Sequence, residues 1–421
     1  HKKYFKNSNQ DSFCIIPFFS KPIVLTRDPI IAKHILQKNH KFYEKSKLQT
    51  KFLSKYLGRG LLTSTGKYWL QQRRLIQPGF HKEKIKNLVS IINETIQDEL
   101  KTIKTGTFVE LYPIMNTLAF EVVAKSLFNY SSNPKTLKRL QDIIEKLQQF
   151  IVKEIRQPQK RIWYKLKGET KLNMALVKES RKIINDIIDN RKASKEAHDD
   201  LLDMLLSAQY EDGTSMNNEQ LIDEILILFV AGHETTANAL TFTLFLLANN
   251  KVELEKAQSE SIEVNDNSLA LEALPKLKYI KNCIEESMRL YPSAWITDRV
   301  ALEDDTVGNF HIKKGTLLGV SIYEMHRNIK YWKNPEQYSP ERFSEENRKK
   351  NGDAYMPFGA GPRFCIGSNF AMYEMMLTIN AILNAFNIET NKTEIKVNPL
   401  ITLKPVDVKL KFIQKSNSVK S

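Results

Sequence analysis

The stretch FGAGPRFCIG, residues 358–367, decides how the rest of this sequence is interpreted. Its glycines at 359, 361 and 367 allow tight turns and a close approach of the backbone to a flat ring system. A helix is predicted to begin just after Cys365 and to run through Ala371 to Phe386, so that its free amides and positive dipole end face the sulfur. This arrangement favours the thiolate form of the cysteine. Cys365 is therefore a candidate metal ligand.

The chain contains two further cysteines, Cys14 and Cys283, and no Cys-x-x-Cys pair. Neither a disulfide framework nor a sulfur-rich zinc site is indicated, and the spacing fits a reducing compartment. A cysteine in a glycine-rich turn can also be a buried structural residue. That interpretation is preferred for Cys14 and Cys283, whereas the complete loop favours a ligand role for Cys365.

Within the loop, Phe358, Gly361, Arg363, Cys365 and Gly367 follow the spacing F-x-x-G-x-R-x-C-x-G. Five such residues coincide by chance in roughly one chain of this length in ten thousand. On these residues the sequence resembles the cytochrome P450 family, in which the loop supplies the thiolate below a haem iron. The resemblance implies haem b (iron protoporphyrin IX) with Cys365 as its axial ligand, Phe358, Arg363 and Gly367 beside it, and O2 as co-substrate. An anionic axial sulfur donates electron density to iron and promotes O–O cleavage.

A second motif, AGHETT at residues 231–236, matches the family's A-G-x-[DE]-T-[TS] signature. A glycine inside a helix costs about 1 kcal/mol relative to alanine, and space for dioxygen beside the haem would explain Gly232. The resemblance implies that Thr235 assists the activation of dioxygen and that Glu234 is its acidic partner and conducts protons. A capping or ion-paired carboxylate is the alternative for Glu234. His233 is interpreted as structural or pocket-lining, since no second histidine stands at ligand spacing.

Glu286 and Arg289 carry the family's E-x-x-R pair, and Arg342 belongs to its P-E-R-F partner. At positions i and i+3 the first two residues share one helical face, and Arg342 could approach from the following coil. An exposed pair would contribute at most a few tenths of a kcal/mol, whereas losing one member of a buried triad costs roughly 3–5 kcal/mol. The three residues are therefore predicted to hold the coil that supports the cysteine loop, without chemical participation.

The two propionates of the implied haem need cationic partners, and guanidinium groups suit carboxylates best. Trp69 and Arg73, four apart on a predicted helix, match the family's W-x-x-x-R element. Arg299, in the strand after the Glu286 helix, and Arg363, in the cysteine loop, occupy two more such positions. A surface location is the alternative for each arginine, most of all for Arg299.

Substrate contacts in the family come from the loop before the Trp69 helix, the helices between residues 137 and 191, the front of the central helix and the strand after Pro292. The matching positions here are mostly apolar and predict a pocket for hydrophobic molecules. They are Leu61, Leu62, Phe229, Ala231, Ala294, Trp295 and Ile296. Core packing is the alternative for each of them, and they identify neither the substrate nor the position that is oxidised.

The chain of 421 residues is 42% hydrophobic and has no obvious repeat or interdomain linker. We expect one catalytic domain over residues 1–421, mainly α with a minor β portion. The resemblance implies the single-domain cytochrome P450 fold, with a long central helix over the haem and a C-terminal cysteine-ligand loop. Because the chain opens at His1 without an initiator methionine, we expect N-terminal residues to be missing.

Helical spacing of apolar residues predicts most of the structure between residues 66 and 292. The predicted helices include Asp28–Asn39, Leu137–Ile155, Leu172–Arg191, Asp200–Ala208 and the buried Ile225–Ala248. Short strands are predicted before Arg27, over Val307–Ile312 and around Leu403–Phe412. A long coil is predicted from Asn334 to Cys365, and long coils in compact chains tend to be functional.

The formal net charge of +15 would attract an acidic protein, an anionic membrane or nucleic acid. Lysines are scattered rather than interleaved with aromatic residues, so we expect no nucleic-acid binding. No segment is typical of a signal peptide or a membrane span, which favours a cytoplasmic protein, and we expect a monomer. A membrane anchor in residues before His1 is left open.

The leading hypothesis is a monooxygenase that hydroxylates or epoxidises a lipophilic molecule such as a fatty acid or terpenoid. The chain has no recognisable flavin or iron–sulfur segment, so a ferredoxin or flavodoxin with its reductase is expected to supply electrons, and the positive charge would assist docking of an acidic donor. A peroxide-dependent peroxygenase or isomerase of the same fold is one alternative, which Glu234 and Thr235 disfavour. A haem-binding sensor without turnover is the other. The sequence does not identify the electron donor.

Overall fold

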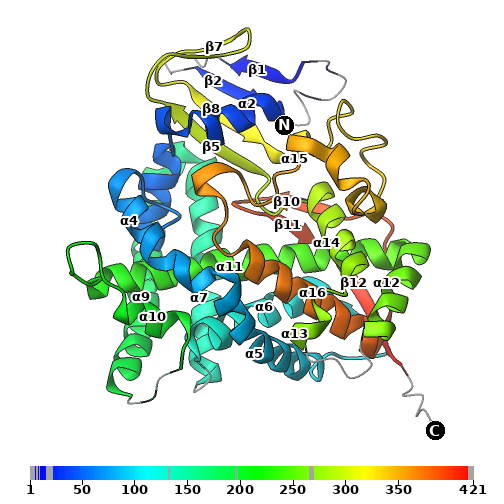
Figure 1. Ribbon diagram of the computed structural model, residues 1–421. Coiled ribbons are helices and arrows are strands. Elements are labelled where there is room, and N and C mark those ends of the chain that lie inside the picture. The colour runs from blue at the N-terminus through cyan, green and yellow to red at the C-terminus, as the bar shows by residue number, and fades with distance from the viewer. Residues whose placement is uncertain are drawn as a thin grey trace. The chain divides into compact units, whose positions relative to one another are not determined.

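The computed structural model describes residues 5, 8, 10–15, 22–130, 133–194, 196, 198–264 and 270–415. Helices account for 61% of the structure and strands for a minor part, which confirms the mainly α class (Figure 1). Two compact units divide the chain. The first comprises His1–Ser46, Ile96–Leu118 and Thr235–Ser421, and the second Lys47–Thr95 and Ala119–Glu234.

The largest sheet of the first unit has the strand order β1-β2-β8-β5-β3. Its strands are β1 (Ser12–Ile15), β2 (Ile23–Thr26), β8 (Leu317–Ser321), β5 (Ile296–Ala301) and β3 (Tyr43–Glu44). Only the β2–β8 pair is parallel among these strands, and β5 places Arg299 opposite Leu318 of β8. One face of the sheet contributes Val24, Leu318 and Val320 to a hydrophobic core that also contains Met356. The sheet therefore anchors the segment that leads into the cysteine loop.

Three smaller sheets complete the strands described in this unit. They are β4-β12-β9 (Phe108–Glu110, Lys409–Gln414, Phe386–Glu389), β10-β11 (Lys396–Pro399, Leu403–Val406) and β6-β7 (Asp305–Val307, Phe310–Ile312). The last two pairs include the strands predicted around residues 307–312 and 403–412. The α-helices that lie entirely within the first unit are α2 (Pro29–Lys33), α12 (Lys251–Val264), α13 (Ala270–Ala273), α14 (Lys278–Leu290), α15 (Ile322–Met325) and α16 (Ser368–Ala385).

The second unit is helical. It contains α3 (Ser54–Leu57), α4 (Gly66–Ile76), α7 (Pro134–Arg156), α8 (Arg161–Leu166), α9 (Glu169–Ala193) and α10 (Leu201–Ser207). Side-chain caps explain two of the starts: Asn133 accepts the amide of Thr136 at α7, and Asp200 accepts the amide of Asp203 at α10. The helices predicted from residues 137, 172 and 200 are confirmed, with bounds that differ by a few residues.

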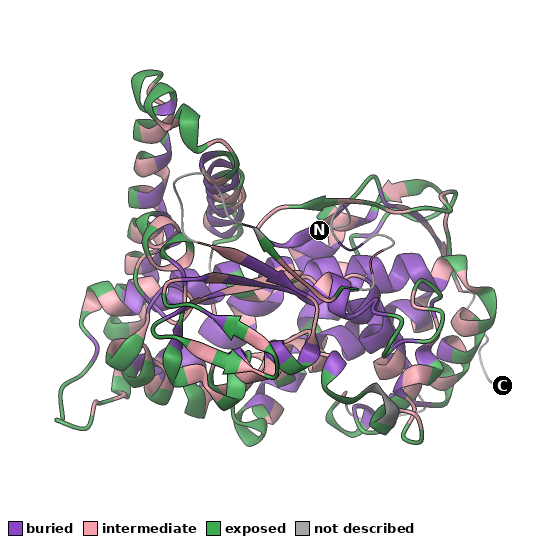
Figure 2. Cartoon of the chain, turned by 90° about the horizontal axis from the view of Figure 1, so that it is seen from above, coloured by how far each residue is buried: buried purple, intermediate pink, exposed green. Residues whose placement is uncertain are grey.

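Three long helices pass through both units: α5 (Lys82–Leu100), α6 (Leu111–Phe128) and α11 (Asn218–Asn249). Helix α11 is long and apolar enough to cross a membrane, but 83% of its most apolar window is buried inside the protein, as in a core helix. Some helices are buried along most of their length in Figure 2, whereas others expose one side. The prediction of a buried helix over residues 225–248 is confirmed.

Two expected elements differ in detail. The helix predicted over Asp28–Asn39 is α2 followed by one π-helical turn, His34–Lys38. The coil predicted from Asn334 to Cys365 contains short 3-10 helices at Pro340–Phe343, Arg348–Ala354 and Gly361–Arg363. Proline at the first or second position starts the first and third of these, because its fixed φ suits a helical turn.

Candidate active site

The cysteine loop is a series of tight turns that ends at α16. The amide of Cys365 donates to the carbonyl of Phe358 over 3.0 Å, and the amide of Phe364 donates to the carbonyl of Gly361 over 3.0 Å. Cys365 is exposed, and α16 begins three residues later at Ser368, as the sequence predicts. The thiol is thus presented outward beside a helix start, where free backbone amides favour negative charge.

The three glycines of this loop differ in backbone conformation. Gly359 and Gly361 adopt φ of 75° and 67°, the left-handed region that favours glycine, whereas Gly367 has a φ of −89°, which any residue can adopt. A Cβ on Gly361 would lie 2.1 Å from the carbonyl oxygen of Leu36. The close approach predicted for Gly361 is therefore an approach to the neighbouring backbone of the π-helical turn.

Three cationic side chains of the first unit interact electrostatically close to this loop. Burial lowers the pKa of Lys45, and the charges of Arg363 and Arg299 lower it further, although part of the Lys45 side chain reaches solvent. Burial also lowers the pKa of Arg299, which donates to Thr297 Oγ1 over 3.3 Å and to the carbonyl of Asp298 over 2.6 Å. Arg299 is therefore not a surface residue.

The cationic cluster of Lys45, Arg299 and Arg363 brings three positively charged side chains into electrostatic interaction. Asp298 favours the charged form of Lys45, but its two carboxylate oxygens also accept from the amide and hydroxyl of Ser46 over 3.2 and 2.9 Å. Clustered cations favour the binding of an anion. The two carboxylates of a haem would suit such a cluster.

Trp69 and Arg73 lie one turn apart on α4 in the second unit, both half-buried. The Arg73 Nε donates to Gln77 Oε1 over 3.2 Å, which fixes the side chain along the helix. The W-x-x-x-R spacing therefore places the two residues on one helical face, as expected.

The AGHETT motif occupies the middle of α11 and presents two different faces. Ala231 is exposed and Thr235, four residues later, is half-buried, whereas His233 and Glu234 are buried. The carbonyl of Thr235 accepts the hydroxyl of Ser293 over 2.8 Å. Ala231 and Thr235 thus share the open face of the helix, and the Glu234 carboxyl adjoins it from the protein interior.

The buried face of this motif is held by aromatic packing within the second unit. His233 Nδ1 lies 2.5 Å from the carbonyl of Phe229, so it carries the proton, and the ring meets Phe120 edge-on at 5.2 Å. Gly232 adjoins α6: a Cβ there would lie 3.0 Å from Val123 Cγ2. Close packing against α6 is thus a second reason for glycine at this position, beside the space for dioxygen that the motif predicts.

Phe229 is a correction to the predicted pocket. Its ring is fully buried and stacks on Phe120 at 5.2 Å and on Phe128 at 4.9 Å. The structure therefore places Phe229 in the packed core, because the ring is removed from solvent and stacks on two other rings. Leu61 and Leu62, in the same unit, are half-buried in the loop between α3 and α4.

The remaining pocket candidates lie at the start of β5 in the first unit. Ala294 is exposed, and Trp295 and Ile296 are half-buried. The indole Nε1 of Trp295 donates to the carbonyl of Leu400 over 3.2 Å, and the carbonyl of Trp295 accepts the amide of Tyr323 over 3.1 Å. These bonds fix the segment and leave apolar surface beside it.

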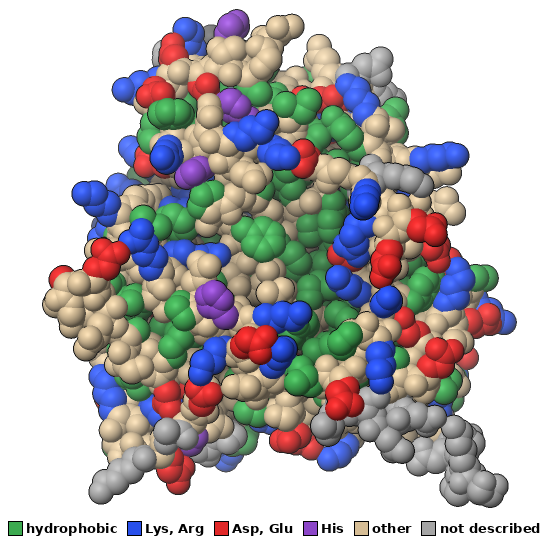
Figure 3. Space-filling view, in the orientation of Figure 1, with side chains coloured by type: hydrophobic (Ala, Val, Ile, Leu, Met, Phe, Trp, Pro, Cys, Tyr) green, Lys and Arg blue, Asp and Glu red, His purple; other side chains and the backbone are tan. Residues whose placement is uncertain are grey.

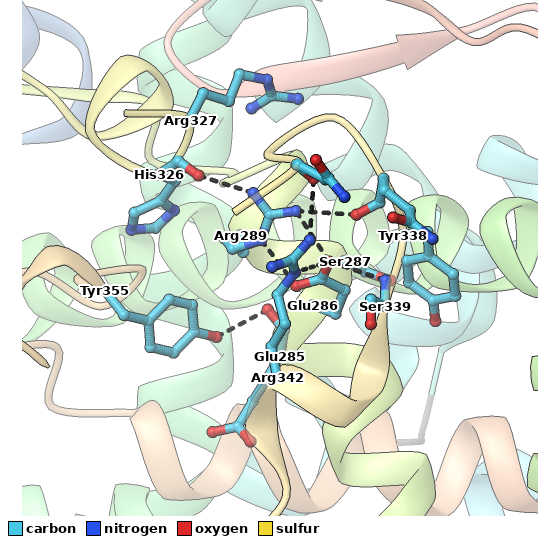
Figure 4. Close-up of polar contacts among 12 residues, drawn as sticks. Glu285, Glu286, Ser287, Arg289, His326, Arg327, Tyr338, Ser339, Arg342 and Tyr355 are labelled. Atoms are coloured by element: carbon cyan, nitrogen blue, oxygen red, sulfur yellow. Dashed lines mark hydrogen bonds and ion pairs between the residues drawn. The ribbon is translucent and has the colours of Figure 1, made fainter. Parts of the chain in front are cut away.

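Glu286, Arg289 and Arg342 form the expected buried triad (Figure 4). Glu286 and Arg289 are fully buried and joined by two parallel bonds of 2.7 and 2.9 Å. Arg342 Nε lies 3.3 Å from Glu286 Oε1, which also accepts the amide of Ser339 over 3.0 Å. The Arg342 side chain is only 15% exposed, so it too is largely removed from solvent. Such charge-assisted paired bonds hold the coil around residue 339 to α14.

The triad also connects to the segment that precedes the cysteine loop. Arg289 Nη1 donates to the carbonyl of His326 over 2.8 Å, and His326 Nε2 accepts the amide of Met356 over 2.9 Å. Burial, with the charges of Arg289 and Arg327, lowers the pKa of His326 to about 3. The imidazole is therefore neutral and can accept this hydrogen bond at any ordinary pH.

Comparison with known proteins identifies the family. The sequence model of the family described as Cytochrome P450 matches residues 1–412. The chain belongs to the cytochrome P450 family. Its similarity to Cytochrome P450 4V2 of Mus musculus is 29% identity, covering 93% of this chain and 82% of that protein. Carotene epsilon-monooxygenase, chloroplastic, of Arabidopsis thaliana is 30% identical, covering 87% of this chain and 72% of that protein.

Solved structures agree with the family at the level of the fold. The crystal structure of the cytochrome P450DA heme domain superposes with a TM-score of 0.86 at 22% identity, covering 96% of this chain and 90% of that one. A crystal structure of a Cytochrome P450 (CYP102L1) gives a TM-score of 0.85 at 26% identity and covers 97% of this chain and 96% of that one. The predicted fold is thereby confirmed.

As a cytochrome P450, the protein is a monooxygenase that binds haem through a cysteine thiolate. The residues of the first unit fit that group, because an exposed thiol lies in the same loop as Arg363 of the cationic cluster. Lys45 and His326 were not among the site residues predicted from the sequence. A lone lysine in a polar run and a lone histidine give no local signal, since their roles depend on burial and on distant partners.

Proposed function

We propose that the chain is one catalytic domain over residues 1–421 that activates O2 with electrons from a separate protein and hydroxylates or epoxidises a lipophilic molecule. Cys365 is the proposed axial ligand of haem b, with Phe358 and Gly367 beside it. The observation that carries this assignment is the exposed Cys365 thiol in one loop with Arg363, whose charge acts on Lys45.

Each protein group has a defined task in this proposal. Bound haem supplies the centre at which dioxygen is reduced and cleaved. Lys45, Arg299 and Arg363 neutralise the propionates, joined by Trp69 and Arg73 of α4. The Thr235 hydroxyl donates a hydrogen bond on the open face of α11, and the Glu234 carboxyl returns a proton to it from the interior. The buried triad keeps the supporting coil fixed and takes no part in proton transfer.

The substrate is proposed to be lipophilic, because the candidate pocket residues are mostly apolar. Leu61, Leu62, Ala231, Trp295 and Ile296 remain in this role together with Ala294, and Phe229 is removed from it. Two relatives from Arabidopsis thaliana, at 30% and 29% identity, are named for different molecules, as Carotene epsilon-monooxygenase and Cytokinin hydroxylase. Their names support the reaction class more than a particular substrate.

A ferredoxin or flavodoxin with its reductase is the proposed electron donor, and the protein is proposed to act as a monomer. The net charge of +15 supports docking of an acidic donor. On the face seen in Figure 3, Lys and Arg side chains are spread among acidic ones rather than gathered in one field. Association should therefore depend on salt without requiring one dominant patch.

Thr235→Ala tests the proposed proton transfer. The variant should consume NADPH but release hydrogen peroxide, and product formed per NADPH should fall by about tenfold or more, because the hydroxyl donor is lost. The measurement compares product, peroxide and NADPH with the substrate found in a spectral-shift screen of fatty acids, terpenoids and steroids.

Thr241→Ala is the matched control, since the Thr241 hydroxyl only bonds the carbonyl of Ala237 within the same helix, over 2.7 Å. It should keep wild-type coupling. Fully coupled turnover by Thr235→Ala would remove that residue from the proposed chemistry.

A cytoplasmic location with contact to an anionic membrane surface is also proposed, and α8 supports it. Ile162, Trp163 and Leu166 are 73%, 60% and 76% exposed, although apolar side chains of this size are usually buried. Basic residues surround them: Arg156, Lys160, Arg161, Lys165, Lys167 and Lys171. The one acidic residue among them, Glu169, is paired with Lys153 over 2.5 Å. Exposed apolar residues flanked along the chain by basic ones match an anionic lipid surface.

Replacing Ile162, Trp163 and Leu166 together by serine should weaken binding to phosphatidylcholine vesicles containing phosphatidylglycerol by tenfold or more, on the order expected from the apolar area lost. Co-sedimentation measures this, and high salt should weaken the wild type as well. Ile329→Ser, which removes a 75% exposed side chain elsewhere, is the control. Equal binding by the triple variant and the control would exclude α8 as the contact.

A further inference from the structure

The loop that connects α3 to α4 donates backbone hydrogen bonds to two consecutive acidic residues of α11. The amide of Arg59 donates to Asp223 Oδ2 over 2.6 Å, and the amide of Leu61 donates to Glu224 Oε2 over 3.0 Å. All four residues belong to the second unit. Alternate amides of one short loop are thus bound by neighbouring carboxyl groups.

Glycines make this approach possible at both positions. A Cβ on Gly58, whose φ is 79°, would lie 2.1 Å from Asp223 Oδ1, and a Cβ on Gly60 would lie 2.5 Å from Glu224 Oε2. Each carboxyl group therefore occupies the space that a side chain at the adjacent loop position would need. The Gly58-Arg59-Gly60 sequence is built for this contact, and any larger residue would displace the loop or the carboxyl group.

The two carboxyl groups differ in their charge environment. Asp223 forms an ion pair with Arg181 and is partly exposed. Glu224 is fully buried, no cation is paired with it among the described residues, and its Oε1 accepts no hydrogen bond from them. Burial raises the pKa of Glu224 to about 8, the Leu61 amide opposes the rise, and the Asp223 charge adds to it. Glu224 is therefore protonated over much of the neutral range.

The other titratable groups that face Glu224 are Tyr68 on α4 and Tyr210 before α11. Burial raises the pKa of both phenols, and the charge of Glu224 raises each further. The pKa of Tyr68 is thereby raised to about 12. Both phenols therefore stay neutral in the pH range in which Glu224 titrates. The guanidinium of Arg181, which pairs with Asp223, keeps its charge there, because burial lowers its pKa but hydrogen bonds to Asp223 and Glu219 raise it overall.

We propose that Glu224 is a positioning residue: its protonated carboxyl group closes the Gly58–Leu62 loop, and its ionisation releases that loop. The consequence for substrate rests on the proposed function, in which Leu61 and Leu62 line the pocket. Closing the loop fixes these two side chains, whereas releasing it widens the pocket and weakens binding of a lipophilic ligand. The contact thereby makes substrate affinity depend on pH through Glu224.

The direction of the pH dependence follows from linkage. In an open loop the solvated carboxyl group titrates near its ordinary value of 4.5, whereas in the closed loop its pKa is about 8. The closed state is therefore most stable below 4.5, loses stability as pH rises between the two values, and changes little above 8. The equilibrium between closed and open loop should shift by about tenfold for each pH unit in that window.

Hydrogen exchange of the full-length protein, followed by mass spectrometry of a peptide containing residues 58–62, measures this equilibrium. Protection in the wild type should fall by about tenfold per unit between pH 5 and 8, after division by the intrinsic exchange rate. Glu224→Gln keeps an uncharged acceptor and should show no such slope. The same slope in Glu224→Gln and wild type would overturn the proposal.

Glu260→Gln is the matched control, because Glu260 likewise accepts backbone amides, in its case those of Tyr279 and Ile280, over 2.6 and 2.8 Å. It should leave the slope of the 58–62 peptide unchanged. If Glu224→Gln does not fold, Gly60→Ala tests the same contact by changing the loop. The added Cβ should clash with the Glu224 carboxyl group and keep the loop open. Protection from exchange should then be low at every pH. Wild-type protection with the wild-type slope in Gly60→Ala would equally refute the contact.

Clotrimazole, which reports on the pocket through a shift of the haem absorbance, separates this inference from the proposed function. The imidazole of clotrimazole titrates near this range, so wild type and Glu224→Gln are compared at each pH: the ratio of wild-type to Glu224→Gln affinity should fall from pH 6 to 8. A pH slope in exchange without one in this affinity ratio would keep Glu224 as the holder of the loop. It would remove Leu61 and Leu62 from the pocket.

Discussion

Reduced Cys365→Ser protein under carbon monoxide is expected to lose the red-shifted Soret band of a thiolate-ligated haem, and its monooxygenase activity should fall to background. The physical reason is that a thiolate donates electron density to iron, whereas a neutral hydroxyl does not. Serine is close to cysteine in size, and it keeps the hydrogen bond that the amide of residue 365 donates to the carbonyl of Phe358. The loop geometry should therefore survive. Absorbance spectra of the reduced, carbon monoxide-bound protein make the measurement.

Cys283→Ala and Cys14→Ala are the matched controls. Cys283 lies fully buried in α14, and burial raises the pKa of its thiol, so it remains protonated and unavailable as a ligand. Both controls should keep the red-shifted band. A wild-type spectrum typical of histidine ligation, or a red-shifted band that persists in Cys365→Ser, would refute the assignment of Cys365.

Local sequence patterns predicted those features that depend on neighbours along the chain. The start of α16 just after the cysteine loop, the long α11 and the pairing of Glu286 with Arg289 follow from helical periodicity and short spacings. Each involves residues within one helix or one turn. Their geometry is therefore set by backbone repeat distances, which the sequence alone specifies.

Features that depend on packing between distant segments could not be predicted. Gly361 is required because its Cα approaches the backbone at Leu36, and Gly232 because it packs on Val123 of α6. Phe229 carries the spacing of a pocket residue but stacks between two other rings. Lys45 joins the cationic cluster across a large sequence separation from Arg363. Such contacts are selected by tertiary structure, for which a single sequence carries no direct signal.

Glu224 illustrates the same limit for electrostatics. Its sequence neighbours, Asp223 and a run of apolar residues, are typical of the polar start of a buried helix. Its raised pKa arises from complete burial against the Gly60–Leu61 backbone, more than 160 residues away in the chain. The sequence could place a carboxyl group at the start of α11, but burial alone decides its charge.

Arg289→Leu is expected to lower the free energy of unfolding by about 3–5 kcal/mol, because it leaves the buried carboxylate of Glu286 with only Arg342 and one amide. Urea unfolding followed by circular dichroism measures the change. The double variant Glu286→Leu/Arg289→Leu removes both charges and should lose less stability than the two single variants summed. Arg74→Leu breaks an ion pair in which both partners are more than half exposed and should cost at most about 1 kcal/mol.

The Arg289→Leu substitution should also disorder the cysteine loop at a lower urea concentration than the one that unfolds the whole protein. Arg289 fixes the carbonyl of His326, and the His326 ring in turn binds the amide of Met356, two residues before Phe358. Haem absorbance in Arg289→Leu should therefore disappear at a lower urea concentration than helical circular dichroism, whereas the two transitions should coincide in Arg74→Leu. Coincident transitions in both variants would mean that the triad stabilises the fold as a whole and has no particular connection to the cysteine loop.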